Sequence, residues 1–354
     1  SGIRKRIPGC IQQIPIIENI DQPITMNETK NIELDFNAAA ARIGGTVKRT
    51  PLEYNAGLSL KYQAEVYLKR EDLQLVRSYK LRGAFNLIST LADEQRHRGV
   101  VCASAGNHAQ GVAYSCKKLN IKGVIFMPEI TPKQKVKQTE MFGGEHIEIV
   151  LVGDTFDDCM REALIYTQAK GMTFIPPFDN PKIIEGQGTV GVEVFEDLPT
   201  VDCVIMPIGG GGLASGVSSY LRNIAPAVEL IGVEPEGAPS MKEALQNGGP
   251  VTLEQVDRFV DGASVKRVGT LNYQYCSELL NQMLLVPEGK ICTTILKLYN
   301  EDAIVVEPAG ALSVAALDQV SDKIKGKKVV CIISGGNNDI ERMQEIKEKS
   351  LLYE

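Results

Sequence analysis

The sequence has no tryptophan and only three histidines among 354 residues, so it offers little support for a histidine-ligated metal site. It also has no CxxC pair, and several of its eight cysteines stand inside apolar runs such as 329–333, which is typical of buried, reduced thiols in a cytoplasmic protein. No apolar run approaches the roughly 20 residues that span a bilayer. Residues 1–6 also lack the apolar stretch of a signal peptide, so we expect no membrane association.

A strong excess of positive charge is absent as well. The chain carries 38 basic and 44 acidic residues, a formal charge of −6, and the two signs are interspersed along the sequence. This pattern argues against a nucleic-acid-binding surface and favours a small-molecule ligand. The content of 44% hydrophobic and 23% charged residues is ordinary for a globular enzyme, and the length allows two lobes or one large domain.

The order of apolar segments predicts an α/β fold with two open parallel sheets. Residues 1–34 contain Pro8, Pro15 and Pro23 and are expected to form an extension without chemistry. Beyond them, short apolar segments alternate with longer amphipathic ones, which is typical of strands and covering helices. Strands are predicted at 100–103, 124–127, 147–152 and 173–175 in a small four-stranded lobe, and at 201–206, 230–233 and 328–333 in a second sheet. Helices are predicted at 35–43, 108–118, 132–142, 155–169, 213–223 and 340–354.

Lys80 stands in the segment SYKLRGA, two residues after Ser78, which favours a helix N-cap. The positive end of a helix beginning near Tyr79 would lower the pKa of this lysine, and Schiff-base chemistry requires the unprotonated amine. Taken alone, Lys80 is more simply explained as one of many solvated lysines. The remaining segments reverse that judgement.

Four glycines, Gly209 to Gly212, follow a predicted buried strand and precede the helix that begins near Leu213. Consecutive backbone N–H groups at a helix N-terminus form a cradle for phosphate. The segment matches neither GxxxxGK[ST] nor GxGxxG, so a single phosphate monoester is favoured over a nucleotide. A tight connection is the alternative, but four consecutive glycines lose much chain entropy on folding.

Two further segments follow predicted strands. Ser104-Ala105-Gly106-Asn107-His108 offers backbone N–H groups for a carboxylate and the Asn107 amide for a phenolate oxygen. An N-cap role for Ser104 and a packing role for His108 are the simpler alternatives. Ser334 opens the segment SGGNND at the carboxyl edge of a sheet, where its hydroxyl is available to a ring nitrogen; a glycine-rich turn is the competing explanation.

The segments SYKLRGA, SAGNHAQG, PIGGGGL, EPAGA and SGGNND, in this order, resemble those of the fold-type II pyridoxal phosphate enzymes, specifically the threonine dehydratases. The resemblance covers about residues 35 to 354. It implies pyridoxal 5'-phosphate as the cofactor and the conversion of L-threonine to 2-oxobutanoate and ammonia, the first step of isoleucine biosynthesis or a step of threonine catabolism.

The resemblance also implies a role for individual residues. Lys80 would carry the cofactor as a Schiff base and act as the base on Cα. The other cofactor-binding residues would be Tyr79, Asn107, Gly209, Gly210, Gly211, Gly212, Leu213, Glu307 and Ser334. The substrate-binding residues would be Ser104, Ala105, Gly106, Asn107, His108, Gly262 and Ala263.

Some positions depart from the pattern of relatives. Serine racemases carry a catalytic serine where this chain has Ala105, so racemisation is expected to be minor. Ser240 replaces an aspartate of the loop that binds a divalent cation in some relatives, and we therefore expect no metal site. Glu185 replaces a small residue, and either a surface change or an altered substrate preference is consistent with that replacement.

Alternatives remain open at this point. L-serine dehydration, or another β-elimination or β-replacement on the same fold, is the nearest one, and a non-catalytic phosphate-ligand binding protein is one of a different class. We expect residues 35–92 with 179–354 to form a large cofactor-binding domain and 93–178 a small one. We also expect a homodimer or homotetramer, with a C-terminal regulatory domain absent or removed beyond the charged run 345–354.

Overall fold

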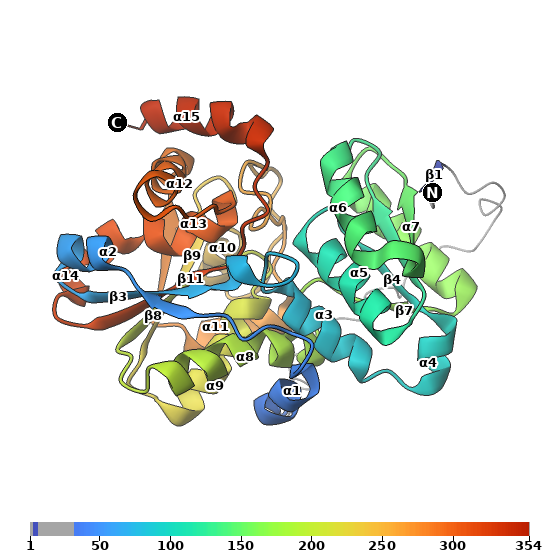
Figure 1. Ribbon diagram of the computed structural model, residues 1–354, viewed down its shortest axis with the longest axis horizontal. Helices are drawn as coiled ribbons and strands as arrows, with labels where there is room; N and C mark the ends of the chain where they lie inside the picture. Colours follow the sequence, from blue (N-terminus) through green and yellow to red (C-terminus); the bar gives the residue numbers. More distant parts are fainter. Residues whose placement is uncertain (1–2, 6–31, 354) are drawn as a thin grey trace.

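The computed structural model describes residues 3–5 and 32–353. Its two sheets lie side by side, and helix α3 runs between them (Figure 1). The helices are α1 (Phe36–Ile43), α2 (Ala56–Tyr62), α3 (Lys80–Ser89), α4 (Asp93–Arg98), α5 (Asn107–Leu119), α6 (Lys133–Gly143), α7 (Phe156–Lys170), α8 (Pro181–Asp197), α9 (Gly212–Ile224), α10 (Ser240–Asn247), α11 (Thr270–Leu279), α12 (Glu288–Asp302), α13 (Pro308–Ala315), α14 (Leu317–Ile324) and α15 (Met343–Leu351), with short 3-10 turns η2 (Glu71–Leu73), η3 (Gly144–His146) and η4 (Ile340–Arg342).

The smaller sheet has five parallel strands in the order β1-β6-β5-β4-β7. Its strands are β1 (Ile3–Lys5), β4 (Val100–Ala103), β5 (Gly123–Met127), β6 (Ile147–Leu151) and β7 (Thr173–Phe174). The sequence predicted four strands in this lobe, whereas the structure has five. The additional strand, β1, comes from the N-terminal extension and pairs with β6. The prolines of that extension lie outside the described residues.

The larger sheet has six strands in the order β10-β9-β8-β11-β3-β2. They are β2 (Leu52–Tyr54), β3 (Glu65–Arg70), β8 (Cys203–Pro207), β9 (Glu229–Pro235), β10 (Gln282–Val286) and β11 (Lys328–Ile333). All pairs are parallel except that of β2 with β3 at one edge. The predicted α/β class is confirmed, although the sequence analysis missed β2, β3 and β10.

Both faces of the larger sheet are buried, which explains its nearly continuous apolar strands. Along β8, Cys203 and Ile205 pack with helices α12 and α13, whereas Val204 and Met206 pack with α8 and α9. The predicted strands and helices agree with the observed ones to within about two or three residues, which is the usual uncertainty of element ends. Strongly apolar runs thus placed the centre of each sheet correctly.

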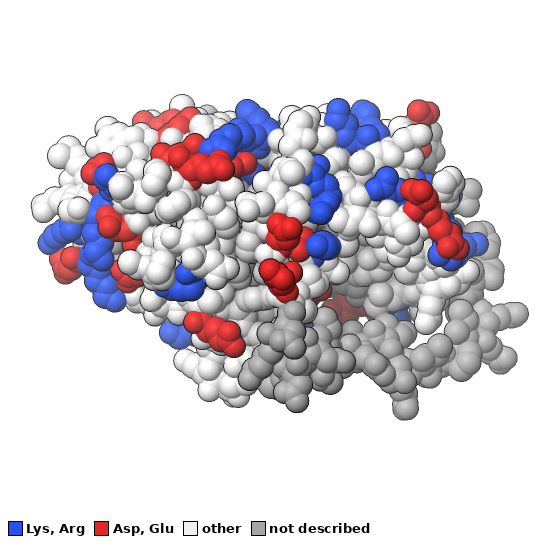
Figure 2. Space-filling view, turned by 90° about the horizontal axis from the view of Figure 1, so that it is seen from below, with Lys and Arg blue, Asp and Glu red and all other residues white. Residues whose placement is uncertain are grey.

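The described surface and thiols follow the composition. Lys and Arg side chains lie among Asp and Glu side chains on the face in Figure 2. Seven cysteines are buried and free, and burial raises the pKa of thiols such as Cys116 and Cys276 to about 12; Cys10 lies outside the described residues. Within residues 3–5 and 32–353, no helix is both long and apolar enough to cross a membrane.

Candidate active site

Three loops meet at one edge of the larger sheet because they follow neighbouring parallel strands. β8 leads into the glycine loop, β11 into Ser334, and β3, through η2, into Lys80. The loops after β3 and β11 are hydrogen-bonded to each other: the Tyr79 backbone N–H donates to the Ser334 carbonyl at 3.2 Å, and Ser78 forms an antiparallel bridge with Gly335. The carboxyl edge of an open α/β sheet is where such folds bind ligands.

Lys80 is the first residue of α3, and its amine donates to the Pro177 carbonyl at 3.0 Å. Burial lowers the pKa of this amine to about 8, while the negative charge of Glu307 acts in the opposite direction. Gly111 of α5 lets that helix approach the Lys80 backbone, since an added Cβ would stand 3.2 Å from Lys80 carbonyl atoms. The lysine is therefore fixed in position and unusually easy to deprotonate.

The N-cap predicted for Ser78 is wrong. Tyr79 is the N-cap residue of α3, and it makes no side-chain cap hydrogen bond. Ser78 is withdrawn from the helix by its backbone bridge to Gly335. Ser104 likewise does not cap α5: Gly106 is the N-cap residue, and the Ser104 hydroxyl accepts from the Gly106 N–H at 3.2 Å.

The glycine loop Gly209–Gly212 ends at a buried helix N-terminus. Gly211 is the N-cap of α9 with a φ of +98°, and no side chain caps that helix. A Cβ on Gly210 would stand 2.1 Å from the ring of Phe178, so only glycine allows this close approach. Backbone N–H groups at such a terminus bind phosphate, so these residues fit the phosphate of pyridoxal phosphate.

Phe178 joins the lysine to the glycine loop. Its ring centre lies 5.9 Å from the Lys80 amine, and the residue stands so close to Gly210 and Gly212 that a Cβ added at either glycine would lie 2.1 or 3.2 Å from it. The next residue, Asp179, accepts hydrogen bonds from the N-terminal backbone of α11, at 2.8 Å from Thr270 N. No local sequence pattern pointed to Phe178, because an aromatic residue in a loop is most simply explained by packing.

The segment Asp261-Gly262-Ala263 and Glu307 lie against the glycine loop. A Cβ on Gly209 would stand 3.1 Å from the Ala263 Cα, and one on Gly262 would stand 3.3 Å from a Glu307 carboxylate oxygen. Burial, and secondarily the charge of Asp261, raises the pKa of Glu307 to about 7. The structure therefore brings Gly262, Ala263 and Glu307 together with the glycine loop.

Asn107 and His108 begin helix α5. The Asn107 amide donates to a Glu307 carboxylate oxygen at 2.6 Å, and its oxygen accepts from Asn337 at 2.7 Å. The His108 ring contacts the Ile175 carbonyl through Nε2 at 2.9 Å. Burial, with the nearby charge of Lys80, lowers the pKa of His108 to about 3, so its imidazole is neutral at physiological pH.

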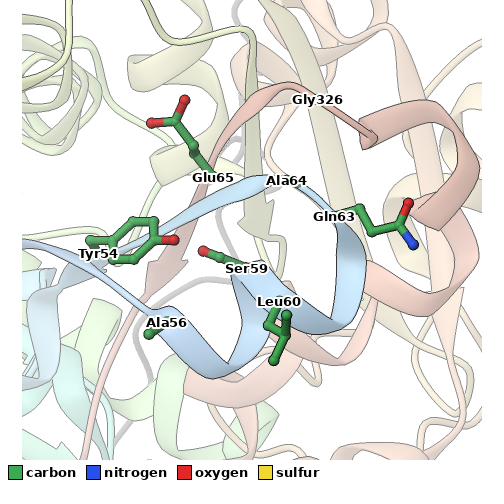
Figure 3. A pocket seen from close by; sticks show the side chains of 8 residues that line it. All are labelled: Tyr54, Ala56, Ser59, Leu60, Gln63, Ala64, Glu65 and Gly326. Carbon is green, nitrogen blue, oxygen red and sulfur yellow. The ribbon is translucent and has the colours of Figure 1, made fainter.

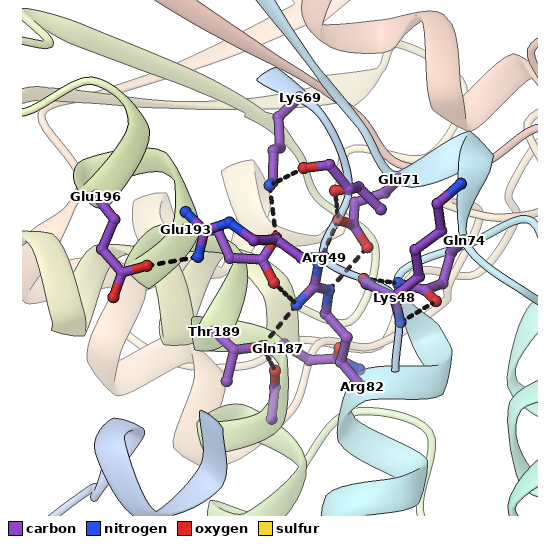
Figure 4. A network of polar contacts seen from close by, with 12 residues as sticks. Lys48, Arg49, Lys69, Glu71, Gln74, Arg82, Gln187, Thr189, Glu193 and Glu196 are labelled. Carbon is purple, nitrogen blue, oxygen red and sulfur yellow. Dashed lines mark hydrogen bonds and ion pairs between the residues drawn. The ribbon is translucent and has the colours of Figure 1, made fainter. Parts of the chain in front are cut away.

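A buried ion network surrounds Arg82, two residues after Lys80 (Figure 4). Its guanidinium donates to both carboxylate oxygens of Glu71, at 2.9 and 2.7 Å, and to Glu193 at 2.7 Å. Lys69 donates to the other Glu193 oxygen at 2.5 Å. Two cations thus balance two carboxylates, which ties α3 to η2, β3 and α8 close to Lys80.

Two further acidic side chains, Glu234 and Glu185, are buried. Glu234 accepts from the backbone N–H groups of Met241 at 2.6 Å and Lys242 at 2.9 Å, so its carboxylate stabilises the start of α10. Glu185, 1% exposed, accepts from Lys182 at 2.8 Å and from the Asp35 N–H at 3.3 Å. The reading of Glu185 as a surface change is therefore wrong.

A shallow hollow elsewhere contains none of the predicted site residues (Figure 3). It lies beside edge strand β2 and helix α2. It is lined by Tyr54, Ala56, Ser59, Leu60, Gln63, Ala64, Glu65 and Gly326. Its position at the edge of the larger sheet separates it from the loops that hold Lys80.

Comparison with known proteins places this site in a family. The family model described as pyridoxal-phosphate dependent enzyme matches residues 43–335. The biosynthetic L-threonine dehydratase of Halalkalibacterium halodurans is 57% identical over 321 residues, which cover 90% of this chain and 77% of that protein. The enzyme of the same name from Bacillus subtilis is 55% identical, over 89% of this chain and 75% of that protein.

Solved structures agree with these relatives. The processed form of threonine deaminase isoform 2 from Solanum lycopersicum superposes with a TM-score of 0.86 at 37% identity, covering 96% of this chain and 98% of that one. Serine racemase from Dictyostelium discoideum gives a TM-score of 0.80 at 31% identity, covering 86% and 98%. The chain belongs to the pyridoxal-phosphate-dependent enzymes and, among them, to the threonine dehydratases.

Proposed function

We propose that this chain converts L-threonine to 2-oxobutanoate and ammonia with pyridoxal 5'-phosphate, as a biosynthetic threonine dehydratase does. The observation that carries the proposal is the Lys80 amine, whose pKa burial lowers to about 8, beside a buried glycine-rich helix N-terminus. A lysine amine reacts with an aldehyde, and such a terminus holds a phosphate. The two groups of this cofactor therefore each have a matching partner.

Each end of the cofactor has residues of this chain to hold it. The backbone N–H groups from Gly209 to Leu213 would hold the phosphate, Asn107 would donate to the phenolic oxygen, and Ser334 would hydrogen-bond the ring nitrogen. When bound, the cofactor supplies an electron sink for the Cα carbon. Because Ser334 is a hydroxyl rather than a carboxylate, the ring nitrogen stays unprotonated, which favours elimination over transamination.

The start of α5 is proposed to bind the substrate carboxylate. Helix α5 begins at Asn107 and no side chain caps it, so the backbone from Ser104 onward presents the positive end of a helix. The imidazole of His108 is neutral, so it adds no positive charge to that of the helix N-terminus. This arrangement orients the amino acid so that its Cα–H faces the Lys80 amine.

Lys80 is proposed to be the base that removes the Cα proton. Its amine is held at the first turn of α3, and a pKa of about 8 keeps a useful fraction neutral at physiological pH. Ala105 has no group that moves a proton on the opposite face. Racemisation therefore stays minor, and the Cα proton and the β-hydroxyl are together lost as one molecule of water.

Assembly, location and domain division are also proposals. We infer a homodimer or homotetramer in the cytoplasm, with residues 35–92 and 179–354 in a large domain and 93–178 in a small one. The biosynthetic relatives and the seven free, buried thiols of the described residues support the location. The strands β4 to β7, which all lie within 93–178, support the division.

The test of the proposed function is an absorbance spectrum combined with product analysis. The purified protein is expected to show the visible band of lysine-bound pyridoxal phosphate, which borohydride bleaches, and to form 2-oxobutanoate from L-threonine in a lactate-dehydrogenase-coupled assay. Lys80→Ala is expected to abolish both, whereas Lys118→Ala, at an exposed lysine of α5, is expected to keep both. A wild-type protein without the band contradicts the cofactor assignment, and a band without product from L-threonine contradicts the substrate.

A further inference from the structure

Asn337 joins three parts of the chain at the site. It lies in the loop after β11, and its amide nitrogen stands 3.0 Å from the Val76 carbonyl oxygen, 2.7 Å from the Asn107 side-chain oxygen and 2.8 Å from the Gln110 side-chain oxygen, so its two N–H groups are shared among three acceptors. Val76 precedes the lysine helix, whereas Asn107 and Gln110 belong to α5. One side chain therefore connects the loop before Lys80 to the helix that carries Asn107.

A backbone atom determines how the side-chain amides of Asn337 and Asn107 are oriented, that is, which of their ends is oxygen and which is nitrogen. A carbonyl oxygen only accepts, so the Asn337 atom that faces Val76 is its nitrogen. The Asn107 atom that faces this nitrogen must then be its oxygen, which places the Asn107 nitrogen toward Glu307. The orientation of the Asn107 amide is thus set by a chain of contacts that begins at the main chain.

A count of hydrogens shows what remains for a ligand. The Asn107 nitrogen carries two N–H groups, and one of them donates to Glu307 at 2.6 Å. Its oxygen is already occupied by Asn337. A single N–H group is left, and it belongs to the amide that faces the cofactor's phenolic oxygen in the proposed function.

We propose that Asn337 is a positioning residue: it fixes the Asn107 amide so that an N–H group, not the oxygen, meets the phenolic oxygen of the cofactor. The proposal rests on the proposed function of this site. Without the Asn337 donor, only the contact with Glu307 still holds the Asn107 amide in this direction, and the amide turns over more readily to present its oxygen to another oxygen. That repulsion weakens cofactor binding and alters the cofactor's absorbance.

Two substitutions separate positioning from packing. Asn337→Ala removes the donor and is expected to weaken the binding of pyridoxal 5'-phosphate to cofactor-stripped protein about tenfold, the effect of one hydrogen bond. Asn337→Asp keeps the size but replaces the donor by an acceptor, which pulls the Asn107 nitrogen toward residue 337. It is therefore expected to bind the cofactor more weakly than Asn337→Ala and to shift the visible band.

Asn338→Ala is the matched control, because the Asn338 amide contacts Met343 and the Asp339 N–H rather than Asn107. It is expected to bind the cofactor as the wild type does. A packing role for Asn337 predicts the reverse order, with the isosteric Asn337→Asp closer to the wild type than Asn337→Ala. That order overturns the proposal.

A double-mutant cycle gives an independent check. In an Asn107→Ala background, Asn337→Ala is expected to cause no further loss of affinity, since the amide that it orients is gone. An equal loss in both backgrounds overturns the proposal, with thermal melts of the cofactor-stripped variants showing that each is folded. If the wild type itself fails to bind pyridoxal 5'-phosphate, the proposed function fails; if it binds and Asn337→Ala binds equally well, only this inference fails.

Discussion

The lowered pKa of Lys80 predicts how fast cofactor-stripped protein captures pyridoxal phosphate at each pH. Only the neutral amine attacks an aldehyde. With a pKa of about 8 the amine is neutral in about one molecule in ten at pH 7, whereas at the ordinary lysine value of 10.5 it is neutral in about one in three thousand. The local environment is thus expected to raise the reactive fraction about three-hundredfold.

The expected profile has a definite shape. Below pH 8 the capture rate rises about tenfold per pH unit, and above pH 8 it levels off because the amine is already neutral. Stopped-flow absorbance at limiting cofactor measures the rate. Dividing by the rate for a free lysine derivative at the same pH removes the ionisations of the cofactor itself. That ratio is expected to be constant well below pH 8 and to fall above it.

The same assay tests the cause of the lowered pKa of Lys80. Burial lowers the pKa of Lys80, and the charge of Glu307 raises it. Glu307→Gln removes that charge, so the plateau is expected to begin at a lower pH than in the wild type. A capture rate that keeps rising through pH 10 in the wild type, as for an exposed lysine, would refute the reasoning.

Two further predictions concern the surroundings of the site. Arg82→Met leaves the buried Glu71 without its cation and is expected to lower the free energy of unfolding by about 3–5 kcal/mol. Arg49→Met is the control: Arg49 and its partner Glu196 are each about half exposed, so its loss is expected to cost under about 1 kcal/mol. Urea titrations measure the free energy of unfolding of both variants, and equal losses would contradict the role of burial. Gly210→Ala forces a Cβ against the Phe178 ring and is expected to weaken cofactor binding about tenfold or more, by about 1–3 kcal/mol, in a titration of cofactor-stripped protein; Gly249→Ala, where an added Cβ meets nothing within 4 Å, is the control and is expected to bind as the wild type does.

The sequence predicted the parts of the fold whose signal is local. Strands such as β8 and β11 are apolar runs buried on both faces, so their composition identifies them. Strand β3 was missed because it contains Lys69 and Arg70, which read as a polar segment. Lys69 is nevertheless fully buried, and its partner Glu193 lies 124 residues away on α8. No local sequence pattern predicts an ion pair between residues so far apart in the chain.

The same distinction applies to the site. The glycine loop and the SGGNND segment carry unusual residues at the ends of strands, so the sequence singled them out. Phe178 and the Pro177 carbonyl that accepts from Lys80 are ordinary residues in a loop, and only the fold brings them to the lysine. The Asn337 amide belongs to a predicted segment, but its role depends on Val76 and Asn107, which lie on two other segments of the chain.

No side chain caps α3, so the position of Lys80 depends on charged residues further along the helix. The first turn is fixed by Arg82, whose guanidinium donates two hydrogen bonds to Glu71 before the helix, two to Glu193 on α8 and one to the Thr189 hydroxyl. A capping carboxylate beside Lys80 would stabilise its ammonium form and raise its pKa, which opposes reaction with an aldehyde. Holding the helix through Arg82 secures the backbone of Lys80 while keeping those two carboxylates paired with other cations. The stability of the first turn and the reactivity of the lysine are thus supplied by different residues.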